Sequence, residues 1–227
     1  ATAATYLKEA GIEQPDAIIT GTALGCLKKT EKFLLAIIEN DEQFLTPTSF
    51  IQSIQNSVSA QIALQLNCTG HNFTFVHKGF SFESALLDAL LLINENEAEN
   101  VLVGGIDEMT DHNYFFYDKL GHWKKERISS ADMLNSGTAG TIGGEGAAFF
   151  VLSKTKSSSD YAQLNAIKTI YNPAGPVEVQ NAISEFLDAN NLSGDAINLV
   201  IYGYNGDVRS DHLYKSVQEN YFKNTAS

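Results

Sequence analysis

The chain is poor in cysteine and has no long apolar run. Its 227 residues include only two cysteines, Cys26 and Cys68, which lie far apart in the sequence. So few thiols make neither a disulfide scaffold nor a metal site, and we interpret both as small buried side chains of a cytoplasmic protein in a reducing environment. No apolar stretch approaches the ~18 residues that span a bilayer, and the N-terminus lacks the basic and apolar segments of a signal peptide. We therefore expect no membrane insertion.

Basic side chains are also scarce. Lys and Arg number 15 against 27 Asp and Glu, which gives a formal net charge of -12 and a pI near 4.7. The cations are scattered, and the pairs Lys28-Lys29 and Lys124-Lys125 are too small to form patches. Nucleic acids and anionic membranes bind clustered cations, so neither is an expected partner. Hydrophobic residues make up 44% of the chain and charged residues 19%, which excludes a disordered protein.

Two kinds of apolar segment alternate along the first two thirds of the chain. Short apolar or β-branched runs predict strands at 16–22, 72–76, 101–106 and 146–153. Apolar residues at helical spacing predict helices from Thr30 onward, over 49–66 and over 81–94, the last with Ser81 as its N-cap. Apolar strands that do not alternate in polarity, separated by helices, indicate a parallel or mixed sheet covered on both faces.

A hydrophilic stretch at 154–160 (KTKSSSD) interrupts this pattern and indicates a connector. We predict two halves of one compact domain, residues 1–155 and 160–227. The second half repeats the theme, with strands predicted at 163–171 and 198–203 and helices at 177–190 and 211–222.

The segment 46–82 resembles the middle of the β-ketoacyl synthases, the condensing enzymes of fatty acid and polyketide synthesis. Those enzymes carry a Pro, a Phe and an Asn, then a helix of small and apolar residues, then a Gly-x-Asn-x-Thr strand. The corresponding residues here are Pro47, Phe50, Asn56, Gly70, Asn72 and Thr74. Three glycine landmarks of the family agree in order: Gly21-Thr22 with Gly25, Gly104-Gly105, and Gly144-Glu145-Gly146-Ala147.

This resemblance implies the thiolase-like α/β fold, a layered α-β-α arrangement of mixed sheets covered by helices. The chain is much shorter than a full synthase, so the fold is expected to be incomplete relative to one. It is either a compact divergent relative or a piece of a longer polypeptide.

The resemblance also locates the catalytic positions of the family. A cysteine on the turn from strand to helix takes the acyl chain, and aligning Gly70, Asn72 and Thr74 without gaps puts Gly79 at that position. Glycine has no side chain and cannot be acylated. Aligning Gly206 with the family's His-Gly-Thr-Gly-Thr turn puts Gly203 where the first histidine stands. We therefore expect two vacated catalytic positions, no condensing activity and no cofactor.

Several residues near these positions have two interpretations. His77 and Lys78 flank Gly79, where they either bind an acyl thioester oxygen or carboxylate, or replace the lost groups structurally. Phe80, with Phe115 and Phe116, is a further candidate for the substrate pocket, although ordinary core packing accounts for the latter pair equally well. Glu145 is an acid/base candidate or a brace for a glycine turn, and the second interpretation is favoured.

Three hypotheses for function follow from the resemblance. The first is a chain-length-factor-like subunit without catalytic activity that pairs with an active β-ketoacyl synthase. The segment NFTFVHKGFSFESALLDA resembles short synthase-like proteins of aryl-polyene and flexirubin-type pathways. The family's dimer pairs through the corresponding strand, so the expected interface contains Phe73, Thr74, Phe75 and Val76. Because acyl carrier proteins are acidic, a chain with a net charge of -12 is expected to meet one only indirectly, through its partner.

The other two hypotheses keep the fold and change the role. One is an acyl-thioester decarboxylase or hydrolase that uses His77 and Lys78. The other is a homodimeric scaffold without a ligand.

Overall fold

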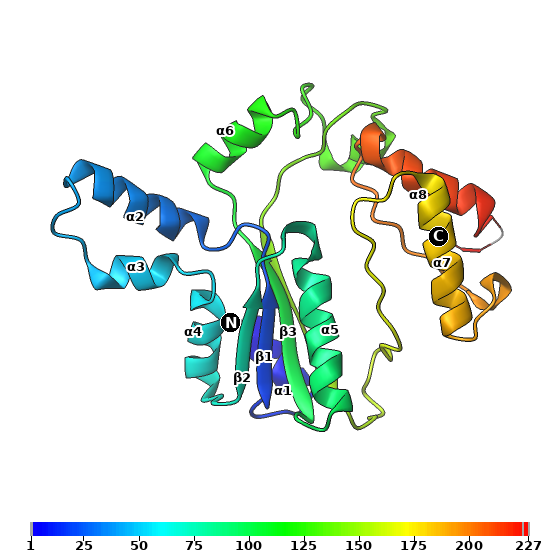
Figure 1. Ribbon diagram of the computed structural model, residues 1–227, viewed down its shortest axis with the longest axis horizontal. Helices are drawn as coiled ribbons and strands as arrows, with labels where there is room; N and C mark the ends of the chain where they lie inside the picture. The colour runs from blue at the N-terminus through cyan, green and yellow to red at the C-terminus, as the bar shows by residue number, and fades with distance from the viewer. Residues whose placement is uncertain (1, 224, 227) are drawn as a thin grey trace. The chain divides into compact units, whose positions relative to one another are not determined.

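Figure 1 shows a computed structural model of the chain that describes residues 2–223 and 225–226. The chain divides into two compact units. The first comprises residues 1–110 and 144–167, and the second comprises residues 111–143 and 168–227. Among the described helices, none is both long and apolar enough to cross a bilayer.

The first unit is built on a four-stranded sheet in the order β2-β1-β3-β4. The strands are β1 (Ala17–Gly21), β2 (His71–Phe75), β3 (Asn100–Asp107) and β4 (Gly146–Ser153). β1 pairs in parallel with both β2 and β3, whereas β4 runs antiparallel to β3. The four strands predicted for this part of the chain and the mixed sheet are therefore confirmed.

Helices cover both faces of this sheet. On one face, α5 (Ser81–Asn94) packs Ala85 and Ala89 against the strands, and on the other face lie α1 (Thr2–Glu9) and α4 (Ser57–Leu66). Neighbouring residues of a strand point to opposite faces, so Ile18 and Ile19 enter different clusters. The strands are apolar without alternation because each face has its own helices to pack against.

The predicted helix at 49–66 is two helices, α3 (Pro47–Ser53) and α4. Ile54 between them has an extended backbone, with φ -73° and ψ 135°. The hydroxyl of Thr30, in α2 (Leu27–Glu39), lies 3.2 Å from the carbonyl oxygen of Ser53 at the end of α3 and 2.9 Å from that of Cys26, and it can donate to either. Apolar spacing continues across this break, and for that reason the prediction of one helix was wrong.

The second unit consists of helices and irregular segments. Its elements are α6 (Asp111–Lys119), α7 (Pro176–Ala189), α8 (Val208–Asn220) and the 3-10 turns η2 (Ser130–Asn135) and η3 (Gly194–Ala196). A small core of Leu187, Val217 and Phe222 joins α7 and α8. The helices predicted at 177–190 and 211–222 are confirmed, although α8 begins three residues earlier.

The strands predicted at 163–171 and 198–203 were wrong, because both segments are irregular. A strand exists only where a neighbour accepts and donates its backbone hydrogen bonds. Within the described residues these segments have a single bridge, between Leu199 and Ala226. Their apolar character was therefore not sufficient to form a strand.

The end of β1 lies against the beginning of α5. A Cβ at Gly21 would stand 2.4 Å from the carbonyl carbon of Ser81 and 2.6 Å from the amide nitrogen of Phe82. These are backbone atoms, so they cannot swing aside as a side chain would. Position 21 therefore requires glycine for this close approach.

We predict that Gly21→Ala lowers the free energy of unfolding by about 3 kcal/mol, because the added methyl group overpacks this contact. Chemical denaturation would measure the loss. Gly79→Ala is the matched control: a Cβ there meets no atom within 4 Å, and the change should stay within about 0.5 kcal/mol. Equal losses in the two variants would contradict the role of Gly21.

Candidate functional site

Gly79 lies at the turn from β2 into α5, inside the 3-10 turn η1 (Lys78–Phe80). Lys78 before it has a φ of +50°, a left-handed conformation that side-chain-bearing residues adopt rarely. A side chain at position 79 would enter open space. We call residues 77–81 the corner. Its backbone places position 79 at the N-terminus of α5, where a nucleophile would be exposed.

Ser81 fastens the corner to β1. Its hydroxyl oxygen accepts from the His77 N–H at 2.8 Å and lies 2.8 Å from the carbonyl oxygens of Thr22 and Lys78, to either of which it can donate. The side chain is only 3% exposed. The predicted N-cap role of Ser81 was wrong, since Phe80 holds that position. A buried hydroxyl with these partners is structural and does not substitute for a nucleophile.

Carboxylates organise the loop that follows β1. Asp107 at the end of β3 accepts from the Thr22 hydroxyl at 2.8 Å and from the backbone N–H groups of Ala23 and Leu24 at 2.9 and 3.1 Å. Glu145 accepts from the Met109 N–H at 3.1 Å. Both carboxylates bind backbone groups, which fits a bracing role for Glu145.

A cavity of about 400 Å³ opens at the carboxyl ends of β1, β2 and β3. Apolar and polar groups both line it, and the polar ones include the hydroxyls of Thr20, Thr22 and Thr74 and the amides of Gln55 and Gln61. This cavity was not among the predicted features of the chain. The signal that could have found it is the threonine near the carboxyl end of both β1 and β2, since the ends of parallel strands meet at one edge of a sheet.

Cys26 also lines this cavity, but its thiol is not prepared for catalysis. Burial, and then the charge of Glu108, raise the pKa of the Cys26 thiol above its ordinary value. A thiol with a raised pKa holds little thiolate at neutral pH and is a poor nucleophile.

Three of the five predicted pocket residues, His77, Lys78 and Phe80, belong to the first unit, and the other two, Phe115 and Phe116, belong to the second. His77 and Lys78 are exposed at the corner, where the His77 ring lies 5.8 Å from the Phe80 ring. Phe115 and Phe116 are exposed on α6, more than half of each side chain. None of these residues belongs to the cavity wall.

Of the predicted interface residues, Phe73, Thr74 and Phe75 lie on β2, which forms one edge of the sheet, and Val76 follows it directly. Phe73 and Val76 are about half exposed (48% and 49%), whereas Phe75 packs into the cluster beneath α5. The Phe75 carbonyl accepts from the Thr22 N–H, so the backbone groups of Phe73 and Phe75 face β1. Because successive residues of a strand alternate, those of Asn72 and Thr74 face away from the sheet, available to another strand.

At Gly203, where the sequence predicts the second vacated catalytic position, another side chain fills the space. The hydroxyl oxygen of Tyr214 on α8 lies 2.8 Å from the point where a Cβ of residue 203 would stand. Tyr202 and Tyr204 flank the glycine, and their rings lie 6.3 and 5.4 Å from that of Tyr214. A histidine at 203 would therefore require Tyr214 to move.

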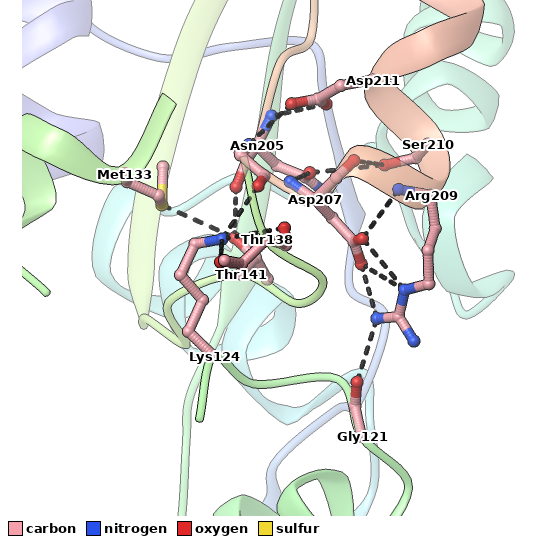
Figure 2. A network of polar contacts seen from close by, with 11 residues as sticks. Gly121, Lys124, Met133, Thr138, Thr141, Asn205, Asp207, Arg209, Ser210 and Asp211 are labelled. Carbon is pink, nitrogen blue, oxygen red and sulfur yellow. Dashed lines mark hydrogen bonds and ion pairs between the residues drawn. The ribbon is translucent and has the colours of Figure 1, made fainter. Parts of the chain in front are cut away.

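A polar network holds the turn between Gly203 and α8 in place (Figure 2). Buried Asp211 accepts from the N–H groups of Asn205 and Gly206 at 3.2 and 3.0 Å, and the Lys124 ammonium donates to the Gly206 carbonyl at 2.9 Å. The side chains of this network bind backbone groups of the turn and one another. We therefore interpret the network as structural.

The family model of the β-ketoacyl synthase N-terminal domain matches residues 1–158. This match covers more than half of the chain, and the chain therefore belongs to the β-ketoacyl synthase family. No curated protein matches it.

Solved structures show the same fold. A β-ketoacyl synthase from Burkholderia phymatum STM815 is 17% identical with a TM-score of 0.73, over 97% of this chain and 59% of that one. The ishigamide ketosynthase/chain length factor is 14% identical with a TM-score of 0.67, over 89% of this chain and 55% of that one. A type II polyketide ketosynthase, in complex with its acyl carrier protein and bound to the hexaketide, is 14% identical with a TM-score of 0.71, over 96% of this chain and 60% of that one.

The chain spans less than two thirds of the length of each of these structures. The thiolase-like α/β fold of the ketosynthases, with its mixed sheet covered by helices, is present here in part.

One prediction concerns Asp207, which caps α8 by accepting from the Arg209 N–H at 3.0 Å and also pairs with the Arg209 guanidinium (Figure 2). The hydrogen bonds from that side chain hold the pKa of the Asp207 carboxyl well below its ordinary value. Such a group stabilises the fold above its unfolded pKa of about 3.9, and the contribution is lost as the pH falls through the lower folded pKa.

We therefore expect Asp207→Asn to flatten the decline of the free energy of unfolding between about pH 5 and about pH 2, since asparagine still caps the helix. Asp207→Ala should lose a further ~1 kcal/mol at neutral pH with the cap. Denaturation at a series of pH values would measure both effects. A slope unchanged in the asparagine variant would show that the Asp207 charge does not contribute.

Proposed function

We propose that this chain is a non-catalytic, chain-length-factor-like subunit that pairs with an active β-ketoacyl synthase. The observation that supports this proposal best is the glycine at position 79, in a corner whose backbone is otherwise suited to a nucleophile. The position has room for a side chain, so the fold does not require glycine there. In this proposal the nucleophilic side chain is lost, whereas the backbone of the corner is kept.

Residues that could replace the nucleophile are unsuited to the task. Cys26 and Cys68 are buried, and the pKa of the Cys26 thiol is raised by burial and by Glu108. The Ser81 hydroxyl holds the corner together. At the second vacated position the Tyr214 hydroxyl occupies the space of the missing side chain. Condensation through a covalent acyl-enzyme has no carrier among these groups.

The partner follows from the family and from the open edge of the sheet. One of the similar structures is a ketosynthase with a chain length factor. In our proposal, β2 of this chain pairs with the equivalent strand of a cysteine-bearing synthase, which satisfies the outward backbone groups of Asn72 and Thr74. The acyl carrier protein binds that partner, because both it and this chain are acidic. The pathway we propose is aryl-polyene or related polyketide synthesis.

The first prediction of this proposal concerns acyl transfer. The purified chain, incubated with malonyl- and acyl-thioesters, should form no covalent adduct by mass spectrometry and release no thiol. As a control for access, Gly79→Cys should gain one rapidly alkylated thiol in the native state, because position 79 opens into free space while both native cysteines are buried. An acyl adduct on the unchanged chain, or turnover that disappears in His77→Ala, would contradict the proposal and favour an enzyme.

The second prediction concerns pairing. Co-expressed with a cysteine-bearing synthase of the same family, the chain should purify as a complex of one copy of each. Asn72→Pro removes an outward N–H from the edge of β2 and should abolish the complex, whereas Asn72→Ala keeps this donor and should retain it. Both variants lose the bond from the Asn72 amide to the Ser59 carbonyl, so the pair isolates the backbone donor. Complex formation by the proline variant would exclude β2 as the interface.

A further inference from the structure

Two helices of the first unit form a pair that buries none of its own residues. α2 and α3 run antiparallel (Figure 1), and we call residues 27–53 the arm. The rings of Phe33 and Phe50 meet at a centroid distance of 5.6 Å, yet no residue of either helix is buried. Isolated helices of this length are marginal in water, and most helical stability comes from packing an apolar face. The arm therefore has apolar surface to bury on another molecule.

That surface is a stripe along α2. Leu34, Leu35 and Ile38 are 52%, 46% and 74% exposed. Their spacing of three and four residues puts them on one side of the helix. Phe33 and Thr30 face α3 instead, through the ring contact and the bond to Ser53. The stripe thus points away from the arm's internal contact.

The charges beside this stripe are arranged against the helix's own dipole. Lys28 and Lys32 are exposed near the N-terminus of α2, whose dipole end is positive, and Glu39 is exposed at its C-terminus. Glu42 is exposed just beyond it. Charges of this sign at these ends are unfavourable for a single helix. In the described part of the chain, the ion pairs do not include any of these four side chains.

We propose that the arm docks on the arm of a second copy of this chain, with the two α2 helices antiparallel. A two-fold axis then sets Lys28 and Lys32 of one copy beside Glu39 and Glu42 of the other, at both ends of the contact. Both helix dipoles also oppose each other favourably. The stripes of Leu34, Leu35 and Ile38 cover one another between the charged ends.

The occupant is a second copy because the pattern is complementary to itself. Any partner has to place acidic groups beside Lys28 and Lys32 and basic groups beside Glu39 and Glu42. A second α2 helix in the antiparallel direction supplies both. The 13 residues of α2 extend about 20 Å, so the contact is small and the dimer is expected to be reversible. This inference does not depend on the proposed pairing of β2 with a synthase.

Charge reversal tests the arrangement directly. We expect sedimentation velocity to show a concentration-dependent dimer for the unchanged chain. Lys28→Glu with Lys32→Glu makes both ends of the contact acidic, and Glu39→Lys with Glu42→Lys makes both basic. Each double variant alone should raise the dimer Kd at least about tenfold. An equimolar mixture of the two should restore association, because each then meets its complement.

Three controls keep the outcome decisive. Lys156→Glu with Lys223→Glu changes the net charge by the same amount as Lys28→Glu with Lys32→Glu, at exposed positions outside the arm, and should leave the dimer intact. Ile38→Glu should abolish association in every combination, and circular dichroism should show that each variant is folded. All variants are also made in a chain that carries Asn72→Pro, which removes pairing through β2. A dimer that persists in this background forms through the arm and not through β2.

Failure of the mixture to associate, or a monomeric unchanged chain at all concentrations, would overturn the inference. So would an arm that is protected from hydrogen exchange only in the complex with a synthase. Loss of the β2 complex in the Asn72→Pro variant would leave the inference untouched. Weakening of the dimer by added salt is expected, since the end charges are exposed.

Discussion

The fold of the first unit depends on the contact between the end of β1 and the corner that begins α5. Gly21 allows the two backbones to touch, and the buried Ser81 hydroxyl joins the carbonyl of Thr22 to the corner. A hydroxyl buried away from water is costly unless it is bonded, so this arrangement permits little displacement. The corner is rigid whether or not its central residue carries a reactive group.

The backbone of the corner is therefore kept although its central residue, Gly79, carries no side chain. The backbone presents position 79 at the start of a helix, although glycine there provides no thiolate. At Gly203, the Tyr214 hydroxyl takes the space that a side chain would need. The first unit also has a cavity at the strand ends, an open strand edge and an arm without a buried face.

Most of the first unit could be predicted from the sequence because its signals are local. The helix at 81–94 has its predicted bounds. Its apolar residues recur every third or fourth position, and the sheet provides a surface for them to pack against. The apolar segments at 163–171 and 198–203 have equally suitable composition but lack neighbouring strands among the described residues. A strand is a property of a pair of segments, so its own residues do not suffice.

The sequence alone determined the family, the alternation of strands and helices in the first unit, and the presence of a glycine at position 79, because each depends on residue identity at a fixed spacing. Only the tertiary structure decided what the polar groups do. It assigned Ser81 to the corner and not to a cap, Asp107 to a loop and Tyr214 to the space beside Gly203. These partners lie 59, 84 and 11 positions away along the chain, and chain folding, which no local pattern records, brings them within hydrogen-bond or contact distance.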